Sequence, residues 1–457
     1  MTRKQFLLGV MALAVLIHLG IVISVAKQPL HVNAFPEQRS LIWSFHHDTI
    51  HRAGPGSDFF AIFHAAVKQA RGESPYDNHE VPHVTPEFYP FRYLPIVAQT
   101  LGRAATMFDG RTAYVIWCVL LEILLAGTLF VLWKILPDWR WRIGLSTALL
   151  LSSPYFLEVH IGQFTFATCA LLAIGLALLD RTEKGYSIGG TAAFAGAVLL
   201  KVFPAAAGAA LIRRKKGLYA VLVAGGLVLL TALPYFLAYP DEWKAFAKVN
   251  FGDTGTEGFH GGNYGFLYMV FLAMGPRGAH GFLVFAKYWQ LIVLGISAAW
   301  ILWRKPTILT GGLTLACAHM ISYKHVWEHH ASGAVVLGVF LLVRLHEDRA
   351  WIGRWIALGC VILLALPTPF RLIDSLDPNV YDPTPSWSPF WRFVLPACKG
   401  LPVFVLWVLG MIQSYRERFS GAADGKADAG AATGAIADPG PAAVRDGDPR
   451  DQGQPEA

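Results

Sequence analysis

The chain has 457 residues, of which 54% are hydrophobic and only 15% charged. Soluble domains carry roughly a quarter charged residues, so this composition excludes an ordinary soluble enzyme. The net charge of +7 does not indicate a nucleic-acid partner, because Lys and Arg in membrane proteins gather in cytoplasmic loops. We therefore predict an all-α polytopic membrane protein that binds no nucleic acid.

Apolar segments recur along most of the chain and predict about 12 transmembrane helices, since a bilayer core of roughly 30 Å needs about 20 apolar residues. Their approximate ranges are 5–26, 112–133, 142–157, 164–180, 187–201, 203–212, 217–237, 283–303, 306–321, 327–344, 350–366 and 393–412. Two of them are too short to cross a bilayer alone. We expect these two, 187–201 and 203–212, to form a hairpin of short helices that meet near Lys201.

Basic residues in the short loops predict that the N- and C-termini are both cytoplasmic. The long loops 27–111, 238–282 and 368–392 are then extracytoplasmic, and functional residues commonly lie in loops held by a rigid scaffold. We predict a multi-pass protein of the cell (plasma or inner) membrane with an extracytoplasmic active site. One membrane domain covers residues 1–418, and the Ala/Gly/Asp/Pro-rich segment 419–457 is predicted to be a disordered cytoplasmic tail.

The first long loop, 27–111, contains a carboxylate in an aromatic setting. Asp58 follows Gly54-Pro-Gly-Ser57 and precedes Phe59-Phe60, in a stretch that predicts an amphipathic helix lying in the membrane interface. Ser57 or Asp58 could cap this helix. Alternatively, the Asp58 carboxylate could take a proton from an acceptor hydroxyl as a general base. Residues 88–95, rich in Tyr, Phe and Pro, suggest either an interfacial aromatic belt or a wall against a lipid chain or a sugar ring.

Polar residues also appear at two later turns on the extracytoplasmic face. The turn from Glu158 to Thr165 contains four hydrogen-bonding side chains, which can simply satisfy the turn or can face a substrate. Lys201 lies at the tip of the short-helix hairpin. A buried ammonium in a membrane protein indicates an anionic partner, and phosphate is the natural one, although the side chain could also extend to the surface.

The densest polar cluster is Ser322-Tyr-Lys-His-Val-Trp-Glu-His-His330. His325 and His329 are four residues apart, which resembles a zinc-binding pair on a helix. The sequence offers no obvious third ligand, so contact with phosphate or proton transfer by imidazole is the preferred hypothesis. We predict no metal site.

Taken in order, these motifs resemble the polytopic glycosyltransferases of family 87, which adopt the GT-C fold. The resemblance covers roughly residues 5–345. It rests on Ser57-Asp58-Phe59 with Phe91-Arg-Tyr-Leu-Pro95, on Gly162-Gln163, on Lys201-Val-Phe-Pro204 and on Trp327-Glu-His-His330. The chain departs from the family pattern at Thr165, where Asn or Ser is usual, and at Tyr323, where Pro often follows the Ser.

The resemblance implies an inverting transferase that moves a hexose, first of all mannose, from a polyprenyl-phosphate donor to a hydroxyl of a lipid or glycan acceptor. Asp58 would be the catalytic base, Lys201 would lie near the carrier phosphate, and His329 or His330 would line the site. The further candidates for donor-phosphate or substrate binding are Gln163, Tyr93, Arg92, Lys324 and His325. We expect no cofactor beyond the lipid-linked sugar phosphate.

Two alternatives remain open at this point. One is an arabinofuranosyl transferase or another lipid-linked sugar transferase. The other is a polytopic lipid or solute transporter, which charged residues deep within many helices and internal repeats would favour. The chain shows few such charges, chiefly Glu122, and no visible repeat.

Overall fold

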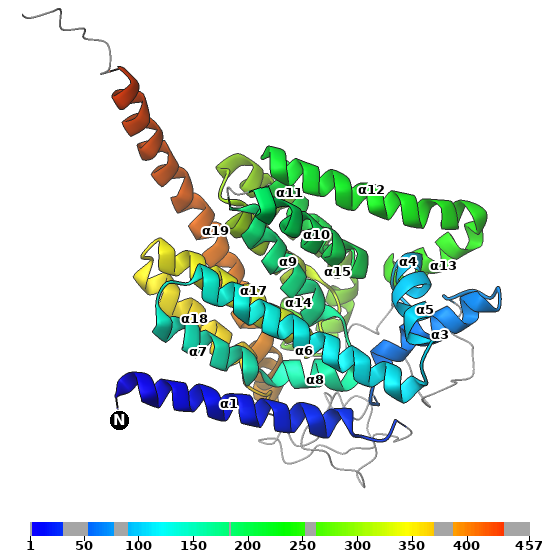
Figure 1. Cartoon of the computed structure of the whole chain (residues 1–457). Coiled ribbons are helices and arrows are strands. Elements are labelled where there is room, and N and C mark those ends of the chain that lie inside the picture. The colour runs from blue at the N-terminus through cyan, green and yellow to red at the C-terminus, as the bar shows by residue number, and fades with distance from the viewer. Residues whose placement is uncertain are drawn as a thin grey trace, which may run out of the picture.

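The computed structural model describes residues 2–30, 54–76, 90–181, 184–251, 262–369 and 387–433, and the regular structure within these ranges is helical (Figure 1). Long helices lie side by side in a bundle, and the short helices between residues 57 and 105 lie at one end of it. The long or apolar helices are α1 (Arg3–Ala26), α6 (Gly110–Ile135), α7 (Trp139–Leu150), α9 (Thr165–Leu179), α10 (Lys184–Leu200), α12 (Lys215–Ala238), α15 (Pro276–Arg304), α16 (Ile308–Ser322), α17 (His330–Glu347), α18 (Trp351–Ala365) and α19 (Pro389–Thr433). The shorter helices are α3 (Ser57–Ala70), α4 (Pro95–Val97), η2 (Ala98–Gly102), α5 (Arg103–Ala105), α8 (Ser153–Ile161), η3 (Phe203–Ala207), α11 (Gly208–Leu211), α13 (Pro240–Phe251) and α14 (Phe266–Leu272).

The helices confirm a multi-pass membrane protein but not the predicted number of crossings. Within the described residues, five helices are long and apolar enough to span a membrane, or seven if each of two bent pairs counts as one span. The helices α10, α16 and α18 are apolar but shorter. The count of about 12 spans is therefore not confirmed, because several apolar segments form short or broken helices.

The predicted crossing 142–157 is wrong as a single helix. Helix α7 ends at Leu150 and α8 begins at Ser153, with Pro154 in its first turn. Proline lacks an N–H and disfavours a helical conformation in the residue before it, so it begins α8 rather than continuing α7. Helices α8 and α9 then bend by 118° across the turn at Gly162. This bend brings the turn against α3.

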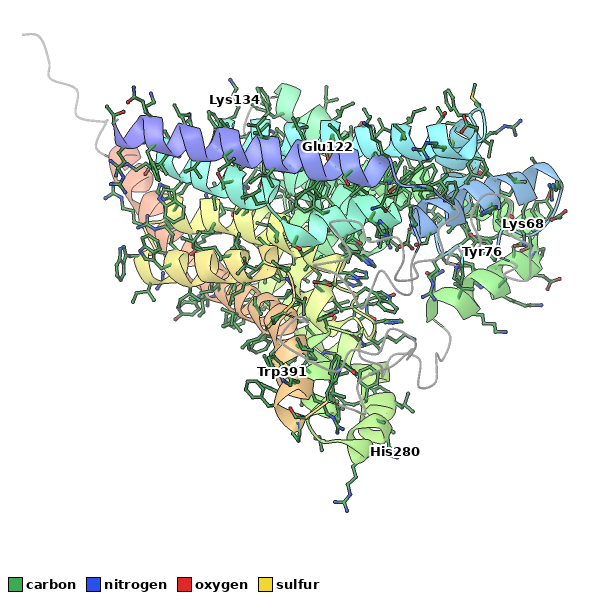
Figure 2. The ribbon with its side chains drawn as sticks, turned by 90° about the horizontal axis from the view of Figure 1, so that it is seen from below. Lys68, Tyr76, Glu122, Lys134, His280 and Trp391 are labelled. Atoms are coloured by element: carbon green, nitrogen blue, oxygen red, sulfur yellow. The ribbon has the colours of Figure 1, made fainter. Side chains whose placement is uncertain are left out.

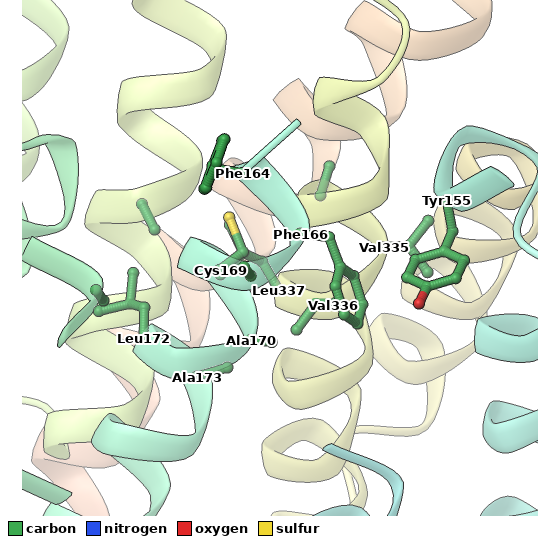
Figure 3. Packing of buried hydrophobic residues seen from close by; sticks show 14 of the residues in the cluster. Tyr155, Phe164, Phe166, Cys169, Ala170, Leu172, Ala173, Val335, Val336 and Leu337 are labelled. Atoms are coloured by element: carbon green, nitrogen blue, oxygen red, sulfur yellow. The ribbon is translucent and has the colours of Figure 1, made fainter. Parts of the chain in front are cut away.

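The predicted short-helix hairpin is present. Helix α10 ends at Leu200, and the chain turns at Lys201 into η3 and α11. The core next to this hairpin is formed by α9 and α17. Figure 3 shows Phe166 of α9 beside Val335 and Val336 of α17, and all three are nearly inaccessible to solvent. The polar turn 162–164 directly precedes α9 and is therefore held in place by the packing of α9 on α17.

Short helices of the first long loop cover one end of the bundle, the right-hand end in Figure 1. Helix α3 does not lie in an interface as predicted: its residues from Ser57 to Ala66 are all buried within the protein. It packs against η2, where a Cβ atom on Gly102 would approach the carbonyl oxygen of Ile62 to 2.8 Å. Figure 2 shows Lys68 and Tyr76 at this end and Lys134 near the opposite end of the bundle.

Helix α1 begins at the end of the bundle opposite α3, and α19 leaves the bundle on that same side (Figure 1). Helix α19 continues to Thr433, beyond the predicted domain boundary at 418. The rest of the predicted disordered tail, 434–457, lies outside the described residues, as do large parts of the long loops: 31–53, 77–89, 252–261 and 370–386.

Candidate active site

The start of helix α3 is joined to the turn between α8 and α9. Gly56 has a φ of 74° and donates its N–H to the carbonyl oxygen of His160 at 2.7 Å. Gly162 has a φ of 69°, and a Cβ atom on it would lie 2.5 Å from the Cβ of Phe59. Both positions favour glycine, because L-residues rarely adopt positive φ and an added Cβ atom would collide with the side chain of Phe60 at Gly56 and of Phe59 at Gly162. The joint places Asp58 directly beside the turn that contains Gln163.

Asp58 does not cap helix α3, so the capping interpretation is wrong. The N-cap residue is Gly56, without any side-chain cap, and Asp58 is the second residue of the helix. Its side chain is 8% exposed, and its Oδ2 atom has no hydrogen-bond partner among the described residues. Such an unpaired buried carboxylate oxygen costs free energy, which is typical of a group kept for function.

Burial raises the pKa of the Asp58 carboxyl to about 7, against the opposing effects of the Lys201 ammonium, the Arg92 guanidinium and the Gln163 side chain. A carboxyl with a pKa near neutrality can accept a proton at working pH and release it afterwards. The site therefore holds a carboxyl with a pKa near neutrality beside two cations.

Gln163 connects three of the predicted site residues. Its Oε1 accepts hydrogen bonds from the Tyr93 hydroxyl at 3.1 Å and from the N–H of Phe164 at 2.7 Å. Its Nε2 lies 3.3 Å from Nε2 of His329. The Gln163 side chain is also a hydrogen-bond partner of Asp58 and lowers the pKa of that carboxyl. Gln163 and His329 are about 6% and 4% exposed, so this network is shielded from water.

Lys201 points toward the start of helix α9. Helices α9 and α10 run antiparallel in close contact: a Cβ atom on Gly175 would lie 2.9 Å from the backbone nitrogen of Phe194. This pairing brings the end of α10 beside the start of α9, where Lys201 Nζ donates to Thr165 Oγ1 at 2.8 Å. Thr165, a departure from the family pattern, thus holds the ammonium. Burial lowers the pKa of Lys201, and the carboxylates of Glu158 and Asp58 oppose this effect.

Glu158 is a buried carboxylate that the sequence reasoning noticed but did not place in the site. It is inaccessible to solvent and accepts hydrogen bonds from the N–H of Phe166 and from the hydroxyl of Ser332, both at 2.5 Å. These bonds join α8, the first turn of α9 and α17. Its position within the polar turn was the one feature of the sequence that pointed to Glu158. Its partners lie in α9 and α17, and no spacing in the sequence predicts these contacts.

The histidine cluster differs from the predicted arrangement. Residues 323–329 connect α16 to α17, so His325 and His329 do not lie on one helical face. Burial lowers the pKa of His329 well below its ordinary value, and the charge of Lys201 adds to this effect. His330 Nδ1 accepts the N–H of Trp327 at 3.0 Å, and its ring stacks on His329 with centroids 4.4 Å apart. Among the described residues, no three His, Cys, Asp or Glu side chains form a metal-binding group.

The structure brings Asp58, Gln163, Tyr93, Lys201 and His329 together. Arg92 is exposed beside this group and acts on Asp58 through its charge. Lys324 and His325 are half-buried in the connection between α16 and α17: the Lys324 carbonyl accepts from Asn263 Nδ2 at 2.8 Å, and the His325 ring lies 4.6 Å from Trp327.

This arrangement combines a buried carboxylate, whose Oδ2 has no hydrogen-bond partner among the described residues, with a half-buried ammonium at Lys201 and an exposed guanidinium at Arg92. It can remove a proton from a hydroxyl and stabilise an anion that forms nearby. A family model described as glycosyltransferase family 87 matches residues 82–322, more than half of the chain. No curated protein matches the chain.

Proposed function

Because the chain belongs to glycosyltransferase family 87 and is a membrane glycosyltransferase, we propose that it transfers a hexose from a polyprenyl-phosphate donor. Mannose is the first candidate. The acceptor is a hydroxyl of a membrane lipid or glycan, and Asp58 is the general base. The observation that carries the proposal is the unpaired Oδ2 of Asp58, buried beside Lys201 and Gln163 at the end of the helical bundle.

The proposed step is a direct displacement. Asp58 takes the proton of the acceptor hydroxyl while the oxygen of that hydroxyl forms a bond to the anomeric carbon. The bond between that carbon and the phosphate oxygen breaks, and the electron pair leaves with the polyprenyl phosphate. Attack opposite the departing phosphate inverts the configuration of the anomeric carbon. Lys201 and Arg92 supply positive charge for the phosphate.

The fold supports an active site on the extracytoplasmic face of the cell membrane. Helix α3, which contains Asp58, lies with α4 and α5 at one end of the bundle, and the start of α1 lies at the other end. A lipid-linked sugar presents its anomeric carbon at the level of the head groups, so a site at the end of a bundle fits this donor. We propose that both termini are cytoplasmic and that one membrane domain, residues 1–418, contains the site.

The experiment is transfer from defined donors. Membranes that contain the wild-type protein would be incubated with radiolabelled polyprenyl-phosphate mannose and, separately, polyprenyl-phosphate arabinose, and the labelled lipid or glycan identified. We expect radiolabelled mannose to appear on an acceptor, with the configuration of its anomeric carbon inverted relative to the donor. Asp58→Asn keeps the size of the side chain but cannot accept the proton, and we expect transfer to fall by roughly 100-fold or more.

Gly225→Ala provides the matched control, because this helical position has open space around it. It should transfer sugar like the wild type. Equal transfer by Asp58→Asn and the wild type, at equal amounts of protein in the membrane, would contradict the assignment of the base. If only the arabinose donor labels an acceptor, the transferred sugar is a pentose rather than mannose. That result would not contradict the assignment of Asp58 as the base.

A further inference from the structure

We infer that Gln163 is a positioning residue that keeps the proton of His329 on Nδ1, so that this N–H donates to an anionic oxygen of the donor phosphate. The inference deepens the proposed function and rests on it for the identity of the ligand. It is carried by the orientation of the Gln163 amide and by an unpaired nitrogen of His329.

The orientation of the Gln163 amide is fixed by its neighbours. A backbone N–H can only donate, so the atom of Gln163 that lies 2.7 Å from the nitrogen of Phe164 must be the amide oxygen. The Tyr93 hydroxyl donates to the same oxygen, since burial raises the pKa of Tyr93 well above its ordinary value and keeps the phenol protonated. The amide nitrogen, a donor only, therefore faces His329.

The tautomer of His329 follows from this contact. Gln163 Nε2 donates to His329 Nε2 across 3.3 Å, so that ring nitrogen must carry a lone pair. His329 is 4% exposed, and the Lys201 charge nearby disfavours an imidazolium. The ring is then neutral, with its single proton on Nδ1.

This Nδ1 atom has no hydrogen-bond partner among the described residues, although it is buried. Buried donors in folded proteins are nearly always paired, so an unpaired one beside an active site indicates a missing ligand. A donor N–H recognises an acceptor oxygen, and Lys201 makes the surroundings favourable for an anion. Phosphate oxygen meets both conditions. His329 thus supplies a fixed hydrogen bond rather than a proton.

Nitrogen-15 NMR of the wild-type protein, labelled at histidine and held in lipid nanodiscs, reads the tautomer directly. The His329 signals are identified by their loss in His329→Asn. We expect a pyrrole-type Nδ1 and a pyridine-type Nε2. A protonated Nε2, in the neutral ring or in an imidazolium, would overturn the inference whether or not the protein transfers sugar.

Kinetics with two amide replacements test the role of the N–H. The amide of His329→Asn lies near the position of Nδ1, whereas that of His329→Gln extends toward the position of Nε2. We expect His329→Gln to weaken donor binding by roughly 10- to 100-fold, the range for a hydrogen bond to a charged group, and His329→Asn to retain most of it. Equal losses in both variants would contradict a hydrogen-bonding role for Nδ1.

These outcomes separate the two proposals. If Asp58→Asn remains active while the NMR shows the Nδ1 tautomer, the proposed base fails and the positioning by Gln163 stands. If Asp58→Asn is inactive and Nε2 carries a proton, the base assignment stands and this inference fails.

Discussion

At the scale of single residues, burial and neighbouring charges have opposite effects on the pKa of Asp58. Burial raises the pKa of its carboxyl, and Lys201 is the strongest opposing charge. The side chain of Lys201 is held by Thr165, so its position relative to the carboxylate is fixed. The strength of the base therefore depends on a residue more than 140 positions away in the sequence.

Lys201→Met should raise the pKa of Asp58, because it removes the largest stabilising charge while preserving side-chain length. In a plot of transfer rate against pH, the rising limb should move to higher pH. Arg92→Met should move it less, because Arg92 is exposed and its charge is screened. A limb that stays in place in Lys201→Met would show that the two groups do not interact.

Asp58→Asn should also stabilise the folded protein at alkaline pH. A carboxyl whose pKa rises from 3.8 to about 7 on folding destabilises the folded state when ionised. This penalty is absent below pH 3.8, grows as pH rises toward 7 and reaches at most about 4 kcal/mol above it. Thermal unfolding in detergent should give a higher Tm for the variant at pH 8, with a smaller difference at pH 5. A constant difference would contradict the raised pKa.

The sequence named in advance several residues that the structure brings together at this scale. It singled out Asp58, Gln163, Lys201 and His329 as separate motifs, because polar residues in apolar surroundings are conspicuous. It could not predict that Gln163 would link Tyr93 to His329, since such links depend on the rotation of each helix. The role of Glu158, whose partners Phe166 and Ser332 lie in other helices, was missed for the same reason.

At the scale of elements, the joint between α3 and the turn after α8 decides where Asp58 lies. Tyr114 of α6 strengthens this joint: its hydroxyl lies 2.8 Å and 2.9 Å from the carbonyl oxygens of Val159 and His160. Both carbonyls belong to the last turn of α8, and they also accept backbone N–H groups: that of Gly162 at Val159 and that of Gly56 at His160. The glycines in the joint were visible in the sequence, but their positive φ and the contact with Phe59 required the three-dimensional structure.

Gly162→Ala should displace α3 and lower activity more than stability. An L-residue at positive φ costs roughly 1–2 kcal/mol, and the new Cβ would collide with Phe59. We expect a loss of several degrees in Tm and a larger relative loss of transfer, because Asp58 moves away from Gln163. An unchanged transfer rate in Gly162→Ala would show that the joint does not position the base.

Glu122, the chief charge within the predicted helices, has local partners. Its carboxylate lies 2.8 Å from His18 of α1 and accepts a bond from the Tyr155 hydroxyl at 2.8 Å. Figure 2 shows Glu122 near the middle of α1. A charge that joins α1, α6 and α8 in this way has a structural use. The sequence identified the charge but not its partners, because the three residues are far apart along the chain.

At the scale of the whole molecule, the helical membrane protein that the sequence predicted is confirmed, whereas the count of about 12 crossings is not. Apolar composition identifies segments that avoid water, whether they span the bilayer or end halfway. Pro154 and the bend after α8 show why segment counts fail here. The position of α3 within the protein also required tertiary contacts, because an amphipathic sequence fits a membrane surface and a protein surface equally well.

The orientation of the bundle can be tested by single-cysteine labelling. Glu73 is exposed just after α3, and Lys215 is exposed at the start of α12, so each can be replaced by a cysteine that a reagent can reach. We expect a membrane-impermeant maleimide to label Glu73→Cys in intact cells and Lys215→Cys only after permeabilisation. The parent protein serves as the control, because four of its five cysteines are buried and Cys398 is half-buried. The reverse pattern would place the site in the cytoplasm.

The most direct test of the central claim, that Asp58 is the base of a glycosyltransferase, is the pH dependence of transfer by the wild-type protein in nanodiscs. Rates at saturating donor and acceptor would be measured from pH 5 to pH 9. The structure predicts a rate that rises with pH and levels off above about 7, as the Asp58 carboxyl loses its proton. A rate that is constant or falls over this range would contradict it.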